Sequence, residues 1–64
     1  MKVGSVLECR GNIYLVKEIH ECGTVVAGLC GRDGEEFFVV PGVNLYIGSN
    51  NIDEYKVIGK AEAI

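Results

Sequence analysis

Four residues of this chain carry side chains that bind metals or act as nucleophiles: Cys9, His20, Cys22 and Cys30. Thiolate and imidazole together suit zinc, and the His20-x-Cys22 spacing would present two ligands from one loop. However, the sequence contains no Cys-x-x-Cys pair, and the spacing of the four residues matches no standard zinc module. A nucleophilic Cys–His pair would also need a group that orients the histidine and an oxyanion site. No nearby residues supply these parts, so we expect no metal, no cofactor and no enzymatic activity.

The acidic residues and the glycines form no pattern typical of catalysis or phosphate binding. The carboxylates fall in pairs at expected turns and loop edges, where their usual role is solubility and protection of strand edges: Glu18 with Glu21, Glu35 with Glu36, and Asp53 with Glu54. The nine glycines include no Gly-x-Gly-x-x-Gly and no Walker-type spacing. We therefore interpret both sets as surface and turn residues.

The basic and aromatic residues are the best candidates for binding a ligand or a partner. Tyrosines combine an apolar ring with a polar hydroxyl, which suits binding surfaces and subunit interfaces. Arginine and lysine side chains near loops would bind an anion if the fold gathers them. The candidate binding residues are Arg10, Lys17, Arg32, Tyr14, Tyr46 and Tyr55.

Length and composition limit the class of protein. With 64 residues, 1–64 form a single small domain, and hydrophobic residues make up 48% of it. No apolar run approaches the roughly 18 residues that cross a bilayer, and the N-terminus does not resemble a signal peptide. An odd number of cysteines favours reduced thiols and hence a cytoplasmic protein. A net charge of −3 argues against a nucleic-acid binder, which needs a concentrated basic surface.

The strongest local signal is a hairpin between Thr24 and Pro41. Two β-prone runs flank Asp33-Gly34, a dipeptide that favours a tight two-residue turn. With these two residues as the turn, Arg32 is expected to pair with Glu35, and Cys30 with Phe37.

Both faces of this hairpin are apolar, which is unusual in so small a protein. One face is expected to fill the interior with Val25, Ala27, Leu29, Phe38 and Val40. The other face carries Val26, Cys30, Phe37 and Val39. Because a small barrel has only one interior, this second face needs a cover, and these four residues are the candidate oligomer interface.

The remaining elements are short. We expect strands at Val3–Cys9 and Ile13–His20, joined by a turn at Arg10–Asn12, with a β-bulge near Lys17-Glu18. Pro41-Gly42 is expected to end the hairpin. After it we expect a short strand or helical turn at Val43–Ile47, a loop at Gly48–Asn51, and a closing segment at Ile52–Ala63 with a strand at Tyr55–Gly59.

Over roughly its first forty residues the chain resembles the SH3-like small β-barrels. The resemblance depends on Val3-Gly4-Ser5-Val6, the turn at Gly11-Asn12, Tyr14-Leu15-Val16 with Ile19, and the long hairpin to Val40. It implies an all-β fold: a small five- to six-stranded SH3-like barrel or a strongly bent antiparallel sheet. It implies no particular activity.

We therefore expect a non-enzymatic binding or inhibitory module that forms a homo-oligomer. It would sequester a small ligand such as a nucleotide, or block a protein partner, as small inhibitors of viral or mobile-element origin do. Two alternatives stay open. One is a nucleic-acid-associated β-barrel, and the other is a metal or redox protein that uses the cysteines and His20.

Overall fold

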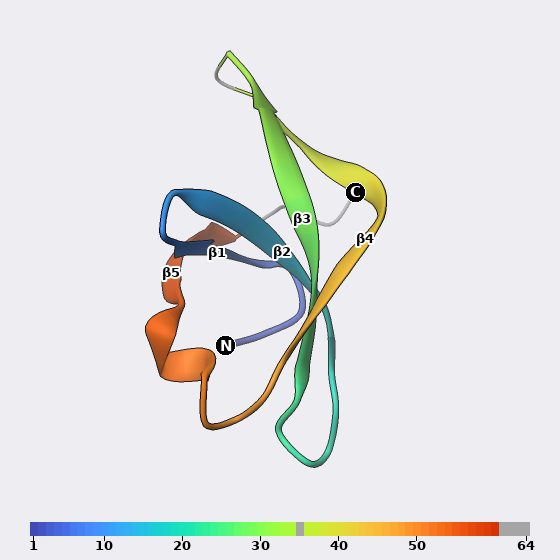
Figure 1. The fold of residues 1–64 in the computed structure, drawn as a ribbon, viewed down its shortest axis with the longest axis vertical. Helices are drawn as coiled ribbons and strands as arrows, with labels where there is room; N and C mark the ends of the chain where they lie inside the picture. The colour runs from blue at the N-terminus through green and yellow to red at the C-terminus, as the bar shows by residue number, and fades with distance from the viewer. Residues whose placement is uncertain (35, 61–64) are drawn as a thin grey trace.

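The structure is a computed structural model that describes residues 1–34 and 36–60, and it is all-β. Five antiparallel strands form one sheet in the order β4-β3-β2-β1-β5 (Figure 1). Their bounds are β1 Ser5–Cys9, β2 Asn12–Ile19, β3 Val25–Asp33, β4 Glu36–Ile47 and β5 Lys56–Lys60. Since β4 and β5 are the two edges, the sheet is bent but not closed. The predicted fold class is confirmed, while the end of the predicted closing segment lies outside the described residues.

The turn between β1 and β2 follows directly from its sequence. Cys9 pairs with Asn12, which leaves Arg10 and Gly11 as the two turn residues. Both have positive φ, at 52° and 84°, the backbone combination of a type I′ turn. Glycine adopts this conformation freely, whereas arginine adopts it at a cost. The turn that the sequence predicts here is confirmed.

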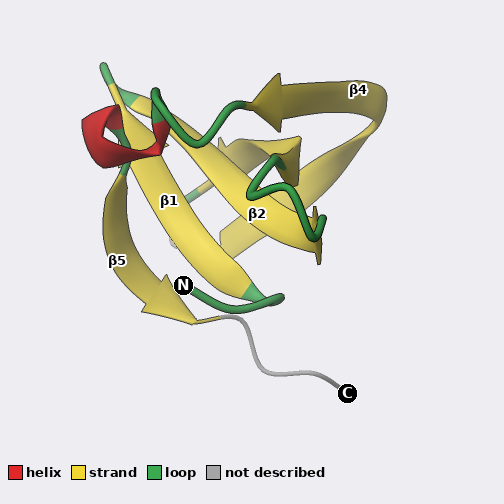
Figure 2. Cartoon of the chain, turned by 90° about the horizontal axis from the view of Figure 1, so that it is seen from below, coloured by secondary structure: helices red, strands yellow, loops and turns green. Residues whose placement is uncertain are grey.

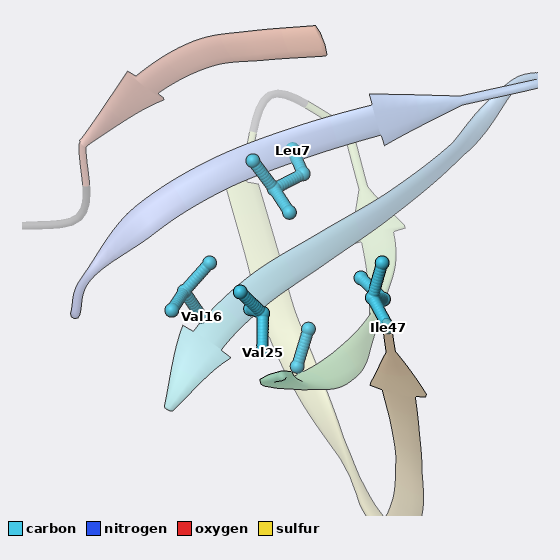
Figure 3. Close-up of a cluster of buried hydrophobic side chains, with 5 residues drawn as sticks. Leu7, Val16, Val25 and Ile47 are labelled. Carbon is cyan, nitrogen blue, oxygen red and sulfur yellow. The ribbon is translucent and has the colours of Figure 1, made fainter. Parts of the chain in front are cut away.

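The core lies on the concave side of the bent sheet. Its buried side chains come from the first four strands: Leu7, Val16, Val25, Ala27 and Ile47. Figure 3 shows the four of them that it labels, Leu7, Val16, Val25 and Ile47, pointing toward one another. Val25 and Ala27 were expected inside, and this is confirmed. Phe38 was expected inside too, and this is wrong because it is 52% exposed. Leu29 and Val40 are half-buried.

The predicted bulge in β2 is confirmed. Val16 pairs with Ala27 and Glu18 pairs with Val26, so Lys17 is the extra residue. An extra residue shifts the side-chain alternation by one position and bends the strand. Beyond the bulge Ile19 pairs with Val25 on the core side, as predicted, although 42% of its surface stays exposed.

The expected register of the β3–β4 hairpin is wrong near its turn. Asp33 belongs to β3 and pairs with Glu36, so Arg32 faces Phe37 and Cys30 faces Val39. The expected partner of Arg32, Glu35, lies outside the described residues. Moving the turn by one residue shifts every pair by two. Since side chains alternate with a period of two, each residue keeps its face.

Pro41-Gly42 does not end β4, which corrects a second prediction. The strand continues to Ile47, and Gly28 pairs with Asn44 while Cys30 pairs with Val39. Only Leu29 therefore lies opposite the four residues 40–43. Proline is tolerated in such a bulge on an edge strand because its missing N–H has no ladder partner to lose. The segment Val43–Ile47 is thus a strand.

The chain closes with a turn of 3₁₀ helix, η1, at Ile52–Glu54, followed by β5. Backbone N–H groups of Asn51 and Ile52 bond to the carbonyl oxygen of Gly48 at 2.9 and 3.1 Å, which forms the predicted loop. β5 then lies along β1, as Figure 2 shows. A single helical turn carries too little periodicity to be predicted from sequence.

Candidate functional site

An apolar groove of about 100 Å³ lies on the face of the sheet opposite the core. It crosses the strands because neighbours in the ladder contribute adjacent side chains: Val6 pairs with Leu15, and Cys30 pairs with both Ile13 and Val39. The groove is lined by Val6, Ile13, Leu15, Cys30, Phe37, Phe38 and Val39. Its lining includes no charged side chain, so an apolar group fits it best.

Two phenylalanines that line the groove, at the tip of the β3–β4 hairpin, are largely exposed to solvent. Phe37 is 48% exposed and Phe38 is 52% exposed. The tip projects beyond the other strands (Figure 1), so the sheet itself cannot cover these rings. The ring of Phe38 lies over Gly31, on the opposite face of β3 from Cys30, and occupies the space where a β carbon on Gly31 would lie. Large exposed rings at a groove are typical of an interaction surface.

Lys17 lies at one end of the groove. Because it is the bulged residue of β2, its side chain reaches across β3 over Gly28. A β carbon on Gly28 would be 2.7 Å from Lys17 Cε and 3.1 Å from Val39 Cγ1. The amine Nζ donates a hydrogen bond of 3.0 Å to Asn44 Oδ1 on β4. The bulge and the glycine together fix a positive charge at this end.

Arg32 lies at the other end. Its guanidinium carbon is 5.4 Å from the centroid of the Phe37 ring, a cation–π distance. Arg32 Nε also donates a hydrogen bond of 2.9 Å to the carbonyl oxygen of Gly34. The side chain is exposed, so its charge remains available to a ligand.

Cys30 lies in the middle of the groove and is half-buried. Burial raises the pKa of its thiol, and the positive charge of Lys17 opposes this rise. The Sγ atom is 3.7 Å from the carbonyl oxygen of Gly28, a weak hydrogen bond. Since a protonated thiol is a poor nucleophile, Cys30 acts here as an apolar lining residue.

The structure brings three of the four candidate interface residues together. Cys30, Phe37 and Val39 line the groove, whereas Val26 is only 4% exposed and lies beside Tyr46 outside it. Sequence reasoning missed the lining residues Val6, Ile13 and Leu15. The alternation of apolar residues in the first two strands was a signal for them. However, it could not show that these residues share a face with Cys30, because that depends on the strand order and register.

Three of the candidate binding residues meet elsewhere, near the β1–β2 turn. The rings of Tyr14 and Tyr55 pack edge to face with centroids 5.7 Å apart. Burial makes the largest contribution to raising the pKa of the Tyr55 hydroxyl. The charges of Cys9, Tyr14 and Glu54 raise it further, whereas the charge of Arg10 lowers it. Tyr46 stands apart and is 69% exposed. The six candidates therefore fall into three groups. Lys17 and Arg32 lie at the two ends of the groove, Arg10 lies near the pair of Tyr14 and Tyr55, and Tyr46 is alone.

The cysteine and histidine residues are not brought together. Nε2 of His20 is 3.7 Å from a carboxylate oxygen of Glu18, and Cys22 Sγ donates a hydrogen bond of 3.3 Å to Thr24 Oγ1. When Cys22 is ionised, the Thr24 hydroxyl donates to the thiolate instead, and this stabilisation of the charged form lowers the pKa of Cys22. Within residues 1–34 and 36–60, no three His, Cys, Asp or Glu side chains are grouped so as to hold a metal ion.

Comparison with known proteins adds no identification. No protein family matches the chain, and no similar curated protein or solved structure was found. In the part of the chain that the structure describes, no helix is long and apolar enough to cross a membrane.

Proposed function

We propose that this chain is a non-enzymatic binding module that docks against a protein surface through its outer groove. The observation that carries this proposal is the apolar lining of the groove, with Phe37 and Phe38 about half exposed at its rim. A module of this kind acts by occupying a surface of its partner, which is how a small inhibitor blocks a larger protein.

The energetics support a cover for this face. Fully burying a phenylalanine or valine side chain contributes about 1.5 to 3 kcal/mol. A chain of 64 residues has a total stability of only about 3 to 10 kcal/mol. Covering the half-exposed Phe37 ring and the groove beside it would therefore contribute a large free energy relative to the stability of this molecule. Such a term favours association strongly.

A second copy of the chain is one candidate for this cover, so a homo-oligomer remains part of the proposal. The three cysteines are free thiols, which supports assignment to the reducing cytoplasm.

Replacing Phe37 with serine tests the groove as an interaction surface. We expect wild-type protein either to exceed its monomer mass in light scattering or, as a monomer, to bind an apolar fluorescent dye. Phe37→Ser should reduce whichever signal is seen, because it removes an exposed ring from the groove. Tyr46→Ser is the matched control, since Tyr46 is more exposed but lies outside the groove. A monomer with equal dye binding in all three proteins would contradict the proposal.

The tyrosine cluster supports a second candidate function, the binding of a small aromatic anion such as a nucleotide. The edge-to-face pair of Tyr14 and Tyr55 offers a stacking surface, and Arg10 lies close enough to influence the charge of Tyr55. Titration with adenosine monophosphate, followed by NMR, tests this candidate. Shift changes confined to this cluster and lost in Tyr55→Ala would support it, and unchanged spectra would dismiss it.

A further inference from the structure

We infer that the outer groove receives an extended acidic segment of a partner protein, with an apolar side chain between two carboxylates. This inference rests on the proposed function and specifies its partner. It is carried by the two cations at the ends of the groove and by the distance between them.

Within residues 1–34 and 36–60, no carboxylate forms a salt bridge with Lys17 or Arg32. Lys17 bonds to the amide oxygen of Asn44, and Arg32 bonds to the carbonyl oxygen of Gly34. Among the described residues, the one ion pair joins His20 to Glu18. The chain has nine acidic and six basic residues, yet no carboxylate pairs with either groove cation within the described ranges. Glu8, which is in register with Ile13, is also in register with Lys56 on β5.

The spacing of the cations selects the conformation of the partner segment. Lys17 lies over Gly28, and Gly28 and Arg32 are four residues apart on β3. At about 3.3 Å per residue, the two positions are about 13 Å apart. In an extended segment, residues i and i+4 span the same distance, and i, i+2 and i+4 point to the same side. Carboxylates at i and i+4 would therefore reach both cations while the side chain at i+2 enters the groove.

The apolar side chain would enter near Cys30. Cys30 is midway between Gly28 and Arg32 on the same face of β3, and it forms part of the groove lining. The groove volume of about 100 Å³ fits one side chain of the size of leucine or valine. The matching pattern is thus acid–x–apolar–x–acid in an extended chain.

A second copy of this chain does not supply that pattern. No two of its nine acidic residues are four apart in the sequence. Stacking two copies groove to groove along antiparallel strands would also place Lys17 of one copy near Arg32 of the other. Like charges facing one another destabilise such an interface.

A synthetic peptide tests the inference directly. The probe is an acetylated, amidated Thr-Glu-Thr-Leu-Thr-Glu-Thr peptide, titrated into isotope-labelled protein and followed by NMR. We expect shift changes at the groove residues and binding about 4- to 25-fold tighter than for the same peptide with both Glu replaced by Gln. Lys17→Gln and Arg32→Gln should each weaken binding about two- to fivefold, because exposed ion pairs contribute modestly.

Matched controls separate charge pattern from overall charge. Lys2→Gln removes the same charge from a residue that precedes β1, outside the β2 and β3 positions at the ends of the groove, and should leave the affinity unchanged. A peptide with its second Glu moved one position points that carboxylate to the opposite side and should bind about two- to fivefold more weakly than the probe, because one carboxylate still reaches its cation. Equal binding of all peptides, or equal loss in Lys2→Gln, would overturn the inference.

One further outcome separates this inference from the proposed function. If the protein is a dimer that Phe37→Ser dissociates, and the acidic peptide does not compete, the groove is covered by a second copy. The binding-module proposal would then stand and the acidic-segment inference would fail. If neither dimer, dye nor peptide binding is affected by Phe37→Ser, both fail.

Discussion

The surroundings of two of the cysteines shift the pKa values of their thiols in opposite directions. Cys22 is exposed at the β2–β3 turn, and the hydroxyl of Thr24 lowers its pKa. Cys30 is half-buried in the groove, and burial raises its pKa. Since the thiolate is the reactive form, these shifts predict different reactivity at the same pH.

Cys22 should be alkylated by iodoacetamide before Cys30 near neutral pH. A lowered pKa gives a larger thiolate fraction at any pH below it, and a raised pKa gives a smaller one. Thr24→Val should slow the alkylation of Cys22 and move its pH midpoint upward, because the hydrogen bond from the hydroxyl is lost. Thr24→Ser keeps the hydroxyl and should keep the rate. Mass spectrometry of peptides over a pH series measures all of these rates, and faster labelling of Cys30 would contradict the assignment.

At the scale of the element, the β1–β2 hairpin contains a residue that its turn does not favour. Arg10 has a φ of 52°, in the left-handed region that asparagine and glycine adopt more readily. The following Gly11 already suits the turn, so a single substitution would give the preferred Asn-Gly sequence.

Arg10→Asn should stabilise the protein by about 0.5 to 1 kcal/mol, because asparagine tolerates positive φ better than arginine. Gly11→Ala should act in the opposite direction by about 1 kcal/mol, since its φ is 84°. Urea unfolding followed by circular dichroism measures both changes. An Arg10→Asn protein that unfolds at lower urea concentration than wild type would show that Arg10 makes contacts that outweigh its backbone cost.

The sequence predicts most of these elements because their signals are local. Gly11 indicates a turn. The break in the alternation of apolar and polar residues around Lys17 indicates a bulge. The tip of the β3–β4 hairpin was predicted one residue early because Asp33 suits a turn and a strand end equally well. The continuation of β4 past Pro41 was missed because the pairing of Asn44 with Gly28 is a long-range contact that no local pattern reports.

The same limit applies to the candidate site. Cys30, Phe37 and Val39 were recognised as a second apolar face from alternation alone. The cations at its ends were named as binding candidates, but their positions depend on the bulge and on the small size of Gly28. Val6 and Ile13 join the groove only because the strand order places β2 beside β3 and β1 beside β2.

At the scale of the whole molecule, one small core carries the fold. Only six apolar side chains are buried in the described residues, and Leu7 and Val16 are the largest of those that are fully buried. With so few buried groups, each contributes a large share of the stability.

Leu7→Ala should destabilise the protein by about 2 to 5 kcal/mol, through lost burial and the cavity that remains. Because the whole chain has a stability of only about 3 to 10 kcal/mol, this loss is a large share of it and should lower the melting temperature markedly. Val57→Ala is the control: Val57 is 50% exposed, so its loss should cost less than about 1 kcal/mol. Thermal unfolding measures the melting temperatures of the two variants. Equal melting temperatures would contradict the larger contribution of Leu7 to stability.

The four residues 40–43 opposite Leu29 divide the hairpin into two parts that can change separately. The half of β4 that supplies Ile47 to the core is tied to the body of the sheet. The half that carries Phe37 and Phe38 is joined to it through residues 40–43, where the regular pairing with β3 is interrupted. Substitutions, and even insertions, at the tip therefore need not disturb the register of the core strands. Such a division lets the tip diverge in sequence while the fold stays constant, so this is the part of the molecule in which a new partner specificity can arise most easily.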